Sequence, residues 1–273
     1  TLRKSTGRRN GHSDQNCPKN GLQVTGHIGR VSYREAAAMG IDNLEHGFLA
    51  ASDWLSGRMP DEPVNIGNIY ASIAELDPQS TEVSQVIQRL IDEDVAVTST
   101  LAIFETFTRG RPPAGEAELA ALTPALRESY LKTWAAISQS QSDIRVRAWD
   151  NNLKMEAEFF NRGGLLVVGT DPTGYGGCLA AYQSWRAIEL LVEASLAPLD
   201  AIKCATSNGA QLLGILDQTE TIEVGKAADL IIVDRNPDET IADLRKTETV
   251  FKEGIGYEYA TLLNSIAGMV GIQ

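Results

Sequence analysis

Apolar and polar positions alternate along the chain in the rhythm of short strands followed by helices. Residues 21–26 predict a strand that ends at His27, and residues 33–39 predict a short helix that Gly40 stops. A second strand is expected over residues 41–44. The order strand, helix, strand within so short a stretch is that of a tight βα repeat.

The middle of the chain continues this pattern with longer connections. Residues 48–79 predict a longer polar connection that contains Pro60, Pro63 and Pro78, and residues 80–93 predict an amphipathic helix. A third strand is expected over residues 95–101, followed by a proline-containing loop and by helical segments over 116–161. The apolar face of the amphipathic helix comprises Val83, Val86, Ile87, Leu90 and Ile91.

A continuous apolar run at residues 165–168 is typical of a strand buried on both faces of a parallel sheet. Helices are expected over 179–195 and 198–213. Residues 229–233 and 249–252 then predict short antiparallel strands of a separate small sheet. Four strand-then-helix units in a row indicate an α/β layer fold or a barrel.

Composition narrows the class of protein. A length of 273 residues that are 43% hydrophobic suits one large domain or two small ones. The net charge of −12 disfavours nucleic acid as a partner, and no apolar run is long enough for a membrane span. Residues 1–20 are basic and lack periodicity, so we expect a disordered leader there. We expect a soluble chain that is cytoplasmic, or exported if a signal peptide lies upstream.

Candidate chemistry lies just after the predicted strands. His27 and His46 end consecutive strands, and Asp171 follows the apolar run at 165–168. Active sites of α/β barrels are built at that end of the strands. Imidazole and carboxylate groups bind zinc and similar ions, which activate water, so the pattern indicates metal-assisted hydrolysis. The third histidine, His12, lies in the basic leader, where we expect it to be solvated.

Other readings of these residues remain open. Either histidine taken alone is more often a structural or surface imidazole than a ligand. The glycine-rich loop after Asp171 is explained by a tight strand-to-helix turn. Alternatively, Gly174 and Tyr175 of that loop contact substrate, with Tyr175 offering an apolar ring and a hydroxyl group.

Six stretches of the chain, taken in order, form a specific set. They are VTGHIG (24–29), GIDNLEHGF (40–48), TSTLAIFET (98–106), VVGTDPTGYGG (167–177), AIKCATSNGAQLLG (201–214) and IEVGKAADLIIVDRNP (222–237). At these residues the chain resembles the metal-dependent amidohydrolase superfamily, and within it the imidazolonepropionase-like and Xaa-Pro dipeptidase-like branch.

The resemblance implies an α/β fold: the second half of a (β/α)8 TIM-like barrel, strands 5–8, plus the C-terminal strands of a small β-sandwich. The partial barrel would span residues 21–214 and the sandwich remnant residues 215–273. His27, His46 and Asp171 match metal ligands of the family, and Asp171 also matches the residue that shuttles a proton from the attacking water. The implied cofactor is one or two divalent metal ions, with zinc expected, and the implied substrate is a small amide or dipeptide.

Two features of the family pattern are missing. No His-x-His motif occurs in the chain, and no lysine can be assigned as the ligand that bridges two metal ions. The alternative to an amidohydrolase is therefore a catalytically incomplete fragment, or a binding or assembly module. The outer strands of half a barrel have unpaired backbone groups, through which the chain could associate with itself.

Overall fold

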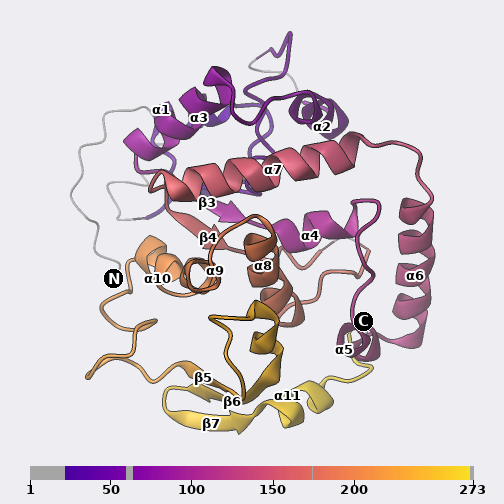
Figure 1. The fold of residues 1–273 in the computed structure, drawn as a ribbon, viewed down its shortest axis with the longest axis vertical. Helices are drawn as coiled ribbons and strands as arrows, with labels where there is room; N and C mark the ends of the chain where they lie inside the picture. Colours follow the sequence, from indigo (N-terminus) through magenta and orange to yellow (C-terminus); the bar gives the residue numbers. More distant parts are fainter. Residues whose placement is uncertain (1–21, 60–63, 174, 271–273) are drawn as a thin grey trace. The chain divides into compact units, whose positions relative to one another are not determined.

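The first four strands of the described chain form one sheet. The computed structural model describes residues 22–59, 64–173 and 175–270 (Figure 1). The sheet has the order β1 (Thr25–Gly26), β2 (Asn43–Glu45), β3 (Ala96–Ser99) and β4 (Leu166–Val168). β1 pairs with β2 and β2 with β3 in parallel, as the sequence predicts, with Leu44 opposite both Gly26 and Val97.

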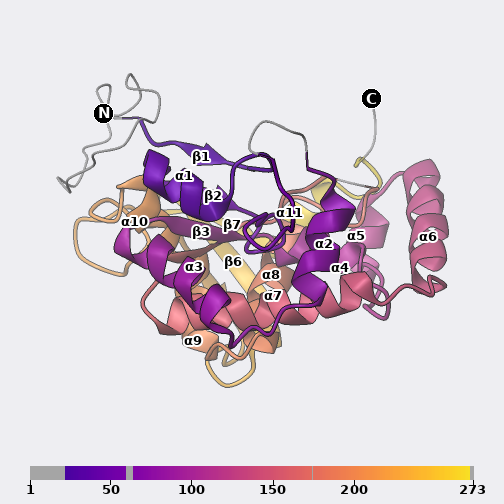
Figure 2. The ribbon, with the colours of Figure 1, turned by 90° about the horizontal axis from the view of Figure 1, so that it is seen from above.

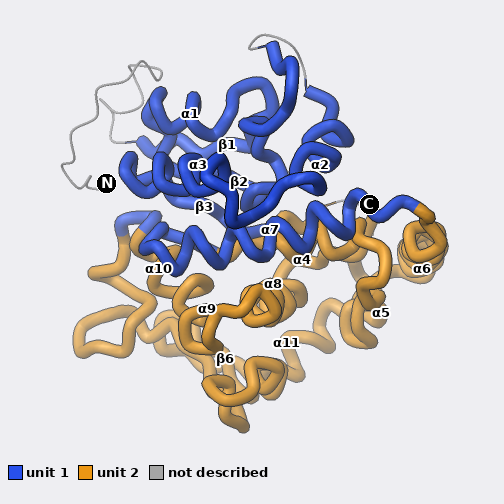
Figure 3. Tube along the Cα trace, turned by 45° about the horizontal axis from the view of Figure 1, so that its top comes forward, with its two compact units in different colours: residues 1–100, 142–167, 212–214 blue, residues 101–141, 168–211, 215–273 orange. Residues whose placement is uncertain are grey.

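The described chain divides into two compact units, which Figure 3 colours separately. Both units are built from separate stretches of sequence, so the chain passes between them several times. The boundaries predicted at residues 20 and 214 stay a prediction, and the leader 1–20 lies outside the described residues. Unit 1 comprises residues 1–100, 142–167 and 212–214, and unit 2 comprises residues 101–141, 168–211 and 215–273.

The predicted helices of unit 1 are present. α1 (Tyr33–Met39) begins with a capping box between Ser32 and Glu35 and ends at Gly40, whose φ of 85° is left-handed. α3 (Thr81–Asp92) buries the predicted apolar face except for Ile91, which is half-buried. α3 packs against α1 and against α7 (Ile144–Asn161) (Figure 2).

The polar connection expected over 48–79 contains a helix that was not predicted. This helix, α2 (Ile66–Ala74), packs on α7. The side chain of Asn65 accepts a hydrogen bond from the Gly67 N–H and so caps the helix, while Ile69 and Ile73 are buried one turn apart. An N-cap residue before apolar side chains at helical spacing was the available signal.

The boundaries of several predicted elements also differ; β1, for example, begins at Thr25 and not at residue 21. The strand expected over 95–101 ends at Ser99, and α4 (Leu101–Thr106) begins at Leu101. The helix expected over 198–213 is divided at Thr206 into α9 (Pro198–Ala205) and α10 (Ser207–Leu213). Thr206 has φ −127° and ψ −96°, outside the helical region, and its carbonyl accepts a hydrogen bond from the Ala210 N–H of the next helix. Unit 2 also contains the helices α5 (Glu116–Ala121), α6 (Pro124–Ser138) and α8 (Tyr182–Glu193).

Unit 2 also contains the predicted small antiparallel sheet, in the order β5 (Leu230–Val233), β6 (Thr247–Lys252) and β7 (Ile255–Glu258). A 3-10 helix, η2 (Ile241–Lys246), precedes β6, and α11 (Tyr259–Ser265) packs against β6 and β7. β7 and α11 were not predicted from the sequence. Glu253 and Gly254 both have positive φ, which is the two-residue type I′ turn that joins β6 to β7.

Candidate functional site

The two histidines predicted at strand ends lie side by side in unit 1. His27 directly follows β1 and His46 directly follows β2, and these strands are parallel neighbours. The two imidazole rings have centroids 4.5 Å apart at an interplanar angle of 73°. His46 is buried, whereas His27 is exposed. The structure therefore brings this pair together, and its role as a pair of metal ligands stays a prediction.

A contact from the next strand orients the His46 ring. Nδ1 of His46 lies 2.9 Å from Oγ1 of Thr100, the residue after β3. Because both groups are buried, this hydrogen bond restricts rotation of the imidazole ring.

The backbone that carries His46 has an unusual conformation. His46 and Gly47 have consecutive positive φ angles of 77° and 56°. For a residue other than glycine, this left-handed region is sparsely populated and persists only where surrounding contacts impose it. Two such contacts hold Gly47: its N–H donates to the Thr98 carbonyl at 2.9 Å, and its carbonyl accepts from the Tyr33 hydroxyl at 2.7 Å.

Two buried side chains of α7 complete this turn. Oδ1 of Asn152 accepts a hydrogen bond from the Phe48 N–H at 2.8 Å, and Nδ2 of Asn152 donates to Oε1 of Glu156 at 2.8 Å. A Cβ atom added at Gly47 would lie 1.9 Å from Oε1 of Glu156. Only glycine therefore fits at position 47.

Glu156 is an ionisable group in the core of unit 1. Its side chain is completely buried, and Oε2 has no hydrogen-bond partner among the described residues. Burial raises the pKa of Glu156 to about 7, and the nearby Ser99 hydroxyl and Asn152 amide offset part of that shift. Glu156 was not predicted from the sequence. The one feature that could have indicated it is its place on the buried side of the helix, with Met155 and Phe159.

A row of polar side chains crosses the sheet beside the histidines. Nδ2 of Asn43 lies 2.9 Å from each of three acceptors, Oγ1 of Thr25, Oε1 of Glu45 and Oγ1 of Thr98. Glu45 also accepts a hydrogen bond from the Thr25 hydroxyl. Its described contacts thus make Glu45 a structural acceptor that joins β1 to β2.

Asp171, the third predicted ligand, belongs to unit 2 and is half-buried. Its φ of 48° is left-handed, and its carbonyl accepts a hydrogen bond from the Thr173 N–H at 2.7 Å. Burial, Asp171 and Glu105 together raise the pKa of the Cys178 thiol to about 12, so Cys178 is neutral near pH 7. A meeting of Asp171 with the histidine pair stays a prediction.

The substrate role predicted for Tyr175 has a structural alternative. Its ring stacks on Tyr130 with centroids 5.3 Å apart and meets Phe107 edge-on at 5.5 Å. Its hydroxyl donates to the Thr106 carbonyl. These contacts give Tyr175 a packing role, and substrate contact stays a prediction; Gly174 lies outside the described residues.

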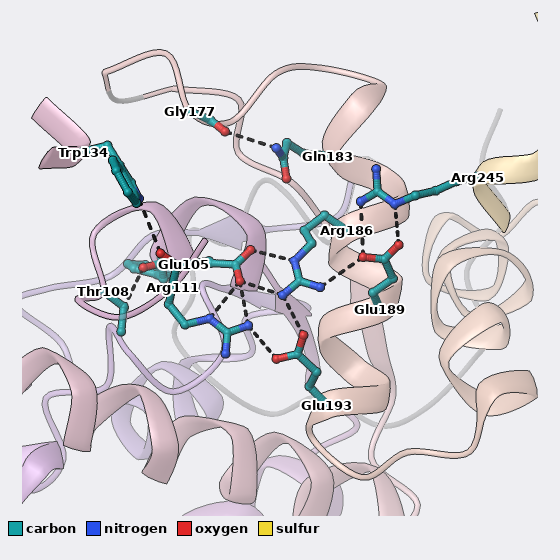
Figure 4. Close-up of polar contacts among 11 residues, drawn as sticks. Glu105, Thr108, Arg111, Trp134, Gly177, Gln183, Arg186, Glu189, Glu193 and Arg245 are labelled. Carbon is teal, nitrogen blue, oxygen red and sulfur yellow. Dashed lines mark hydrogen bonds and ion pairs between the residues drawn. The ribbon is translucent and has the colours of Figure 1, made fainter. Parts of the chain in front are cut away.

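Unit 2 also contains a network of ion pairs that the sequence did not indicate (Figure 4). The guanidinium of Arg186 binds both oxygens of Glu105, at 2.7 and 2.8 Å, and also contacts Glu189 and Glu193. Arg245 pairs with Glu189 at 2.6 Å. A cavity of about 260 Å³ is bordered by Glu105, Arg186, Glu189 and Arg245. Because the acids and arginines pair with one another, the network ties η2 to α8 and α8 to α4.

A complete metal centre is not seen within residues 22–59, 64–173 and 175–270. No group of three or more His, Cys, Asp or Glu side chains there could hold a metal ion. The same part of the chain has no helix with the length and apolarity that crossing a membrane requires.

The parallel sheet, with polar side chains just after its strands, defines an α/β fold. Residues 140–255 match the Amidohydrolase family. The resemblance noted in the sequence is thereby confirmed, on a segment that contains Asp171 but neither histidine. The chain matches none of the curated proteins.

Solved structures support the same fold. A Xaa-Pro dipeptidase with bound methionine is 22% identical with a TM-score of 0.55, covering 89% of this chain and 46% of its own. A bottromycin amidohydrolase is 19% identical with a TM-score of 0.60, and the match covers 92% of this chain and 55% of that protein. A putative prolidase from Bifidobacterium longum is 20% identical with a TM-score of 0.53, and the match covers 96% of this chain and 57% of that protein. The chain therefore spans about half the length of the structures it matches.

Proposed function

We propose that the chain supplies the C-terminal part of a metal-dependent amidohydrolase, which hydrolyses an amide or peptide C–N bond. The observation that carries this proposal is the pair of imidazole rings at the ends of adjacent parallel strands, with centroids 4.5 Å apart. The family match covers residues 140–255, which include Asp171. The resemblance at Asp171 supports it as the third ligand of the proposed site.

The donor groups fit a zinc-type ion. Two nitrogens bound to one zinc ion at about 2.0–2.1 Å lie no more than about 4.2 Å apart. Rings with centroids 4.5 Å apart can present nitrogens at that separation. Since Nδ1 of His46 contacts Thr100, the ligand role of His46 falls to Nε2. His27, His46 and a carboxylate oxygen of Asp171 make up three ligands of the proposed site.

The chain's own residues would bind the ion and move one proton. A bound divalent ion lowers the pKa of water and polarises a carbonyl group. Asp171 would accept a proton from the attacking water at a carboxylate oxygen and pass it to the leaving nitrogen. The buried contacts of His46 would keep its ring fixed during the reaction.

The proposed substrate is a small amide or dipeptide. The solved structures that support this proposal include a Xaa-Pro dipeptidase with bound methionine and a putative prolidase. Those proteins are about twice as long as this chain, so the complete activity would need a complementary N-terminal part.

Calorimetric titration with zinc tests the metal role. The full chain should bind zinc weakly because it lacks the His-x-His pair. His27→Ala and His46→Ala should each abolish this binding, whereas His12→Ala should leave it unchanged. Equal zinc binding by all four proteins would contradict the proposal. Two tight stoichiometric sites in the unaltered chain would contradict the expected weak binding.

A second candidate, an assembly module, is favoured by the exposed apolar side chains of the small sheet. Ile232 on β5 and Ile255 and Tyr257 on β7 are 45%, 60% and 44% exposed. Association through such strands would cover them. Sedimentation equilibrium discriminates the candidates: a concentration-independent monomer argues against self-assembly.

A further inference from the structure

Two buried side chains of α7 contact the chain segment that carries His46. Asn152 and Glu156 lie one turn apart on α7, and both are fully buried. Their polar groups face the chain segment that directly follows His46: Asn152 binds the Phe48 N–H, and Oε1 of Glu156 occupies the space beside Gly47. A helix interior rarely buries two such groups without a specific partner.

The contacts on this segment come from three directions. The Thr98 carbonyl holds the Gly47 N–H from β3, and the Tyr33 hydroxyl holds the Gly47 carbonyl from α1. Asn152 holds the next N–H, that of Phe48, from α7. The left-handed φ angles at 46 and 47 are thereby imposed by the surroundings rather than by the local sequence.

We infer that Asn152 and Glu156 are positioning residues that fix the His46–Gly47 turn and thereby aim the His46 imidazole toward its neighbour His27. Asn152 acts through its bond to Phe48, and Glu156 acts by orienting Asn152 and filling the space beside Gly47. The importance of this orientation for metal binding rests on the proposed function. The orientation of the His46 ring can be measured in the metal-free chain.

The imidazole signals of the full chain test this inference directly. The protein has only three histidines, so ¹⁵N-histidine labelling gives three ring patterns, which His→Gln variants assign. The unaltered chain should show a His46 pattern that differs from the averaged tautomers of a solvated imidazole, because Nδ1 lies 2.9 Å from Oγ1 of Thr100 in a buried environment. In Asn152→Ala and Glu156→Ala, the His46 pattern should shift toward averaged tautomers.

Two variants separate positioning from stability. Asn151 is the adjacent buried amide on α7, and it binds the carbonyls of Ile73 and Leu76 instead. Asn151→Ala should lower the thermal midpoint while leaving the His46 pattern unchanged. Glu156→Gln keeps an oxygen for Asn152, so it should retain the wild-type His46 pattern and remain folded.

The inference is overturned if Asn152→Ala and Glu156→Ala keep the His46 pattern of the unaltered chain, or if Asn151→Ala shifts it equally. If the alanine variants do not fold, Asn152→Ser serves in their place, because it shortens the side chain without removing its polarity, and the same shift is expected. Zinc added afterwards reports on the proposed function separately: the expected His46 patterns with no response to zinc would refute the metal role and leave the positioning role intact.

Discussion

Replacing Glu156 by glutamine should make the chain's stability depend less on pH. Burial raises the pKa of Glu156 from its ordinary value of 4.5 to about 7 in the folded protein. Between these two values the folded state binds more protons at this residue than the unfolded state does. The free energy of unfolding therefore falls as the pH rises through this window, and the stabilisation by the protonated form is fully present only below about pH 4.5.

The size of this effect follows from the shift. At about 1.4 kcal/mol per pKa unit, a rise from 4.5 to about 7 corresponds to about 3 kcal/mol, most of which is lost between pH 5 and pH 8. Glutamine stays neutral throughout and keeps an oxygen for the Asn152 amide. Tyr33 is the titratable neighbour of Glu156, and burial holds its pKa well above 10, so it does not ionise in this range.

Urea unfolding of both proteins at pH 5, 6, 7 and 8 measures the effect. The difference in unfolding free energy between Glu156→Gln and the unaltered chain should change by about 2 to 3 kcal/mol in favour of the variant from pH 5 to pH 8. Groups that titrate alike in both proteins cancel in this difference. Glu158→Gln, an exposed residue on the same helix, should show no such change. A flat difference for Glu156→Gln would refute the raised pKa.

Three further changes have defined outcomes. Gly47→Ala should lower the unfolding free energy by at least about 2 kcal/mol, because its Cβ would lie 1.9 Å from Oε1 of Glu156. A double-mutant cycle with Glu156→Ala should show coupling between the two substitutions, and strict additivity would contradict the clash. Tyr175→Phe should lower stability by about 1 kcal/mol through the lost bond to the Thr106 carbonyl, and an unchanged urea midpoint would count against that bond. In an enzyme reconstituted with a complementary N-terminal part, Asp171→Asn should abolish turnover but retain metal, and a near-normal kcat would remove Asp171 from the proton-transfer role.

Local signals explain how much of the fold the sequence could predict. α1 was predicted to the residue because Ser32 caps its start and Gly40 stops it. α2 was missed because prolines near it suggested an irregular connection, although Asn65 caps it. The break at Thr206 lies between two apolar helical patterns that continue in phase, so no periodicity marks it.

The candidate site was predictable to the extent that its residues directly follow strands. His27 and His46 were found because strand ends can be read from apolar runs, and the structure places their rings together. Glu156 and Asn152 could not be found in this way. Their importance depends on the close approach of α7 to Gly47, a contact between residues far apart in the sequence.

Zinc titration of the ¹⁵N-histidine-labelled full chain is the sharpest test of the proposed metal site, because it observes each of the three imidazoles separately. We expect the His27 and His46 signals to shift together with one midpoint, while the His12 signal does not follow them. If His27 and His46 do not respond, or if all three histidines respond alike, the proposed metal site is contradicted.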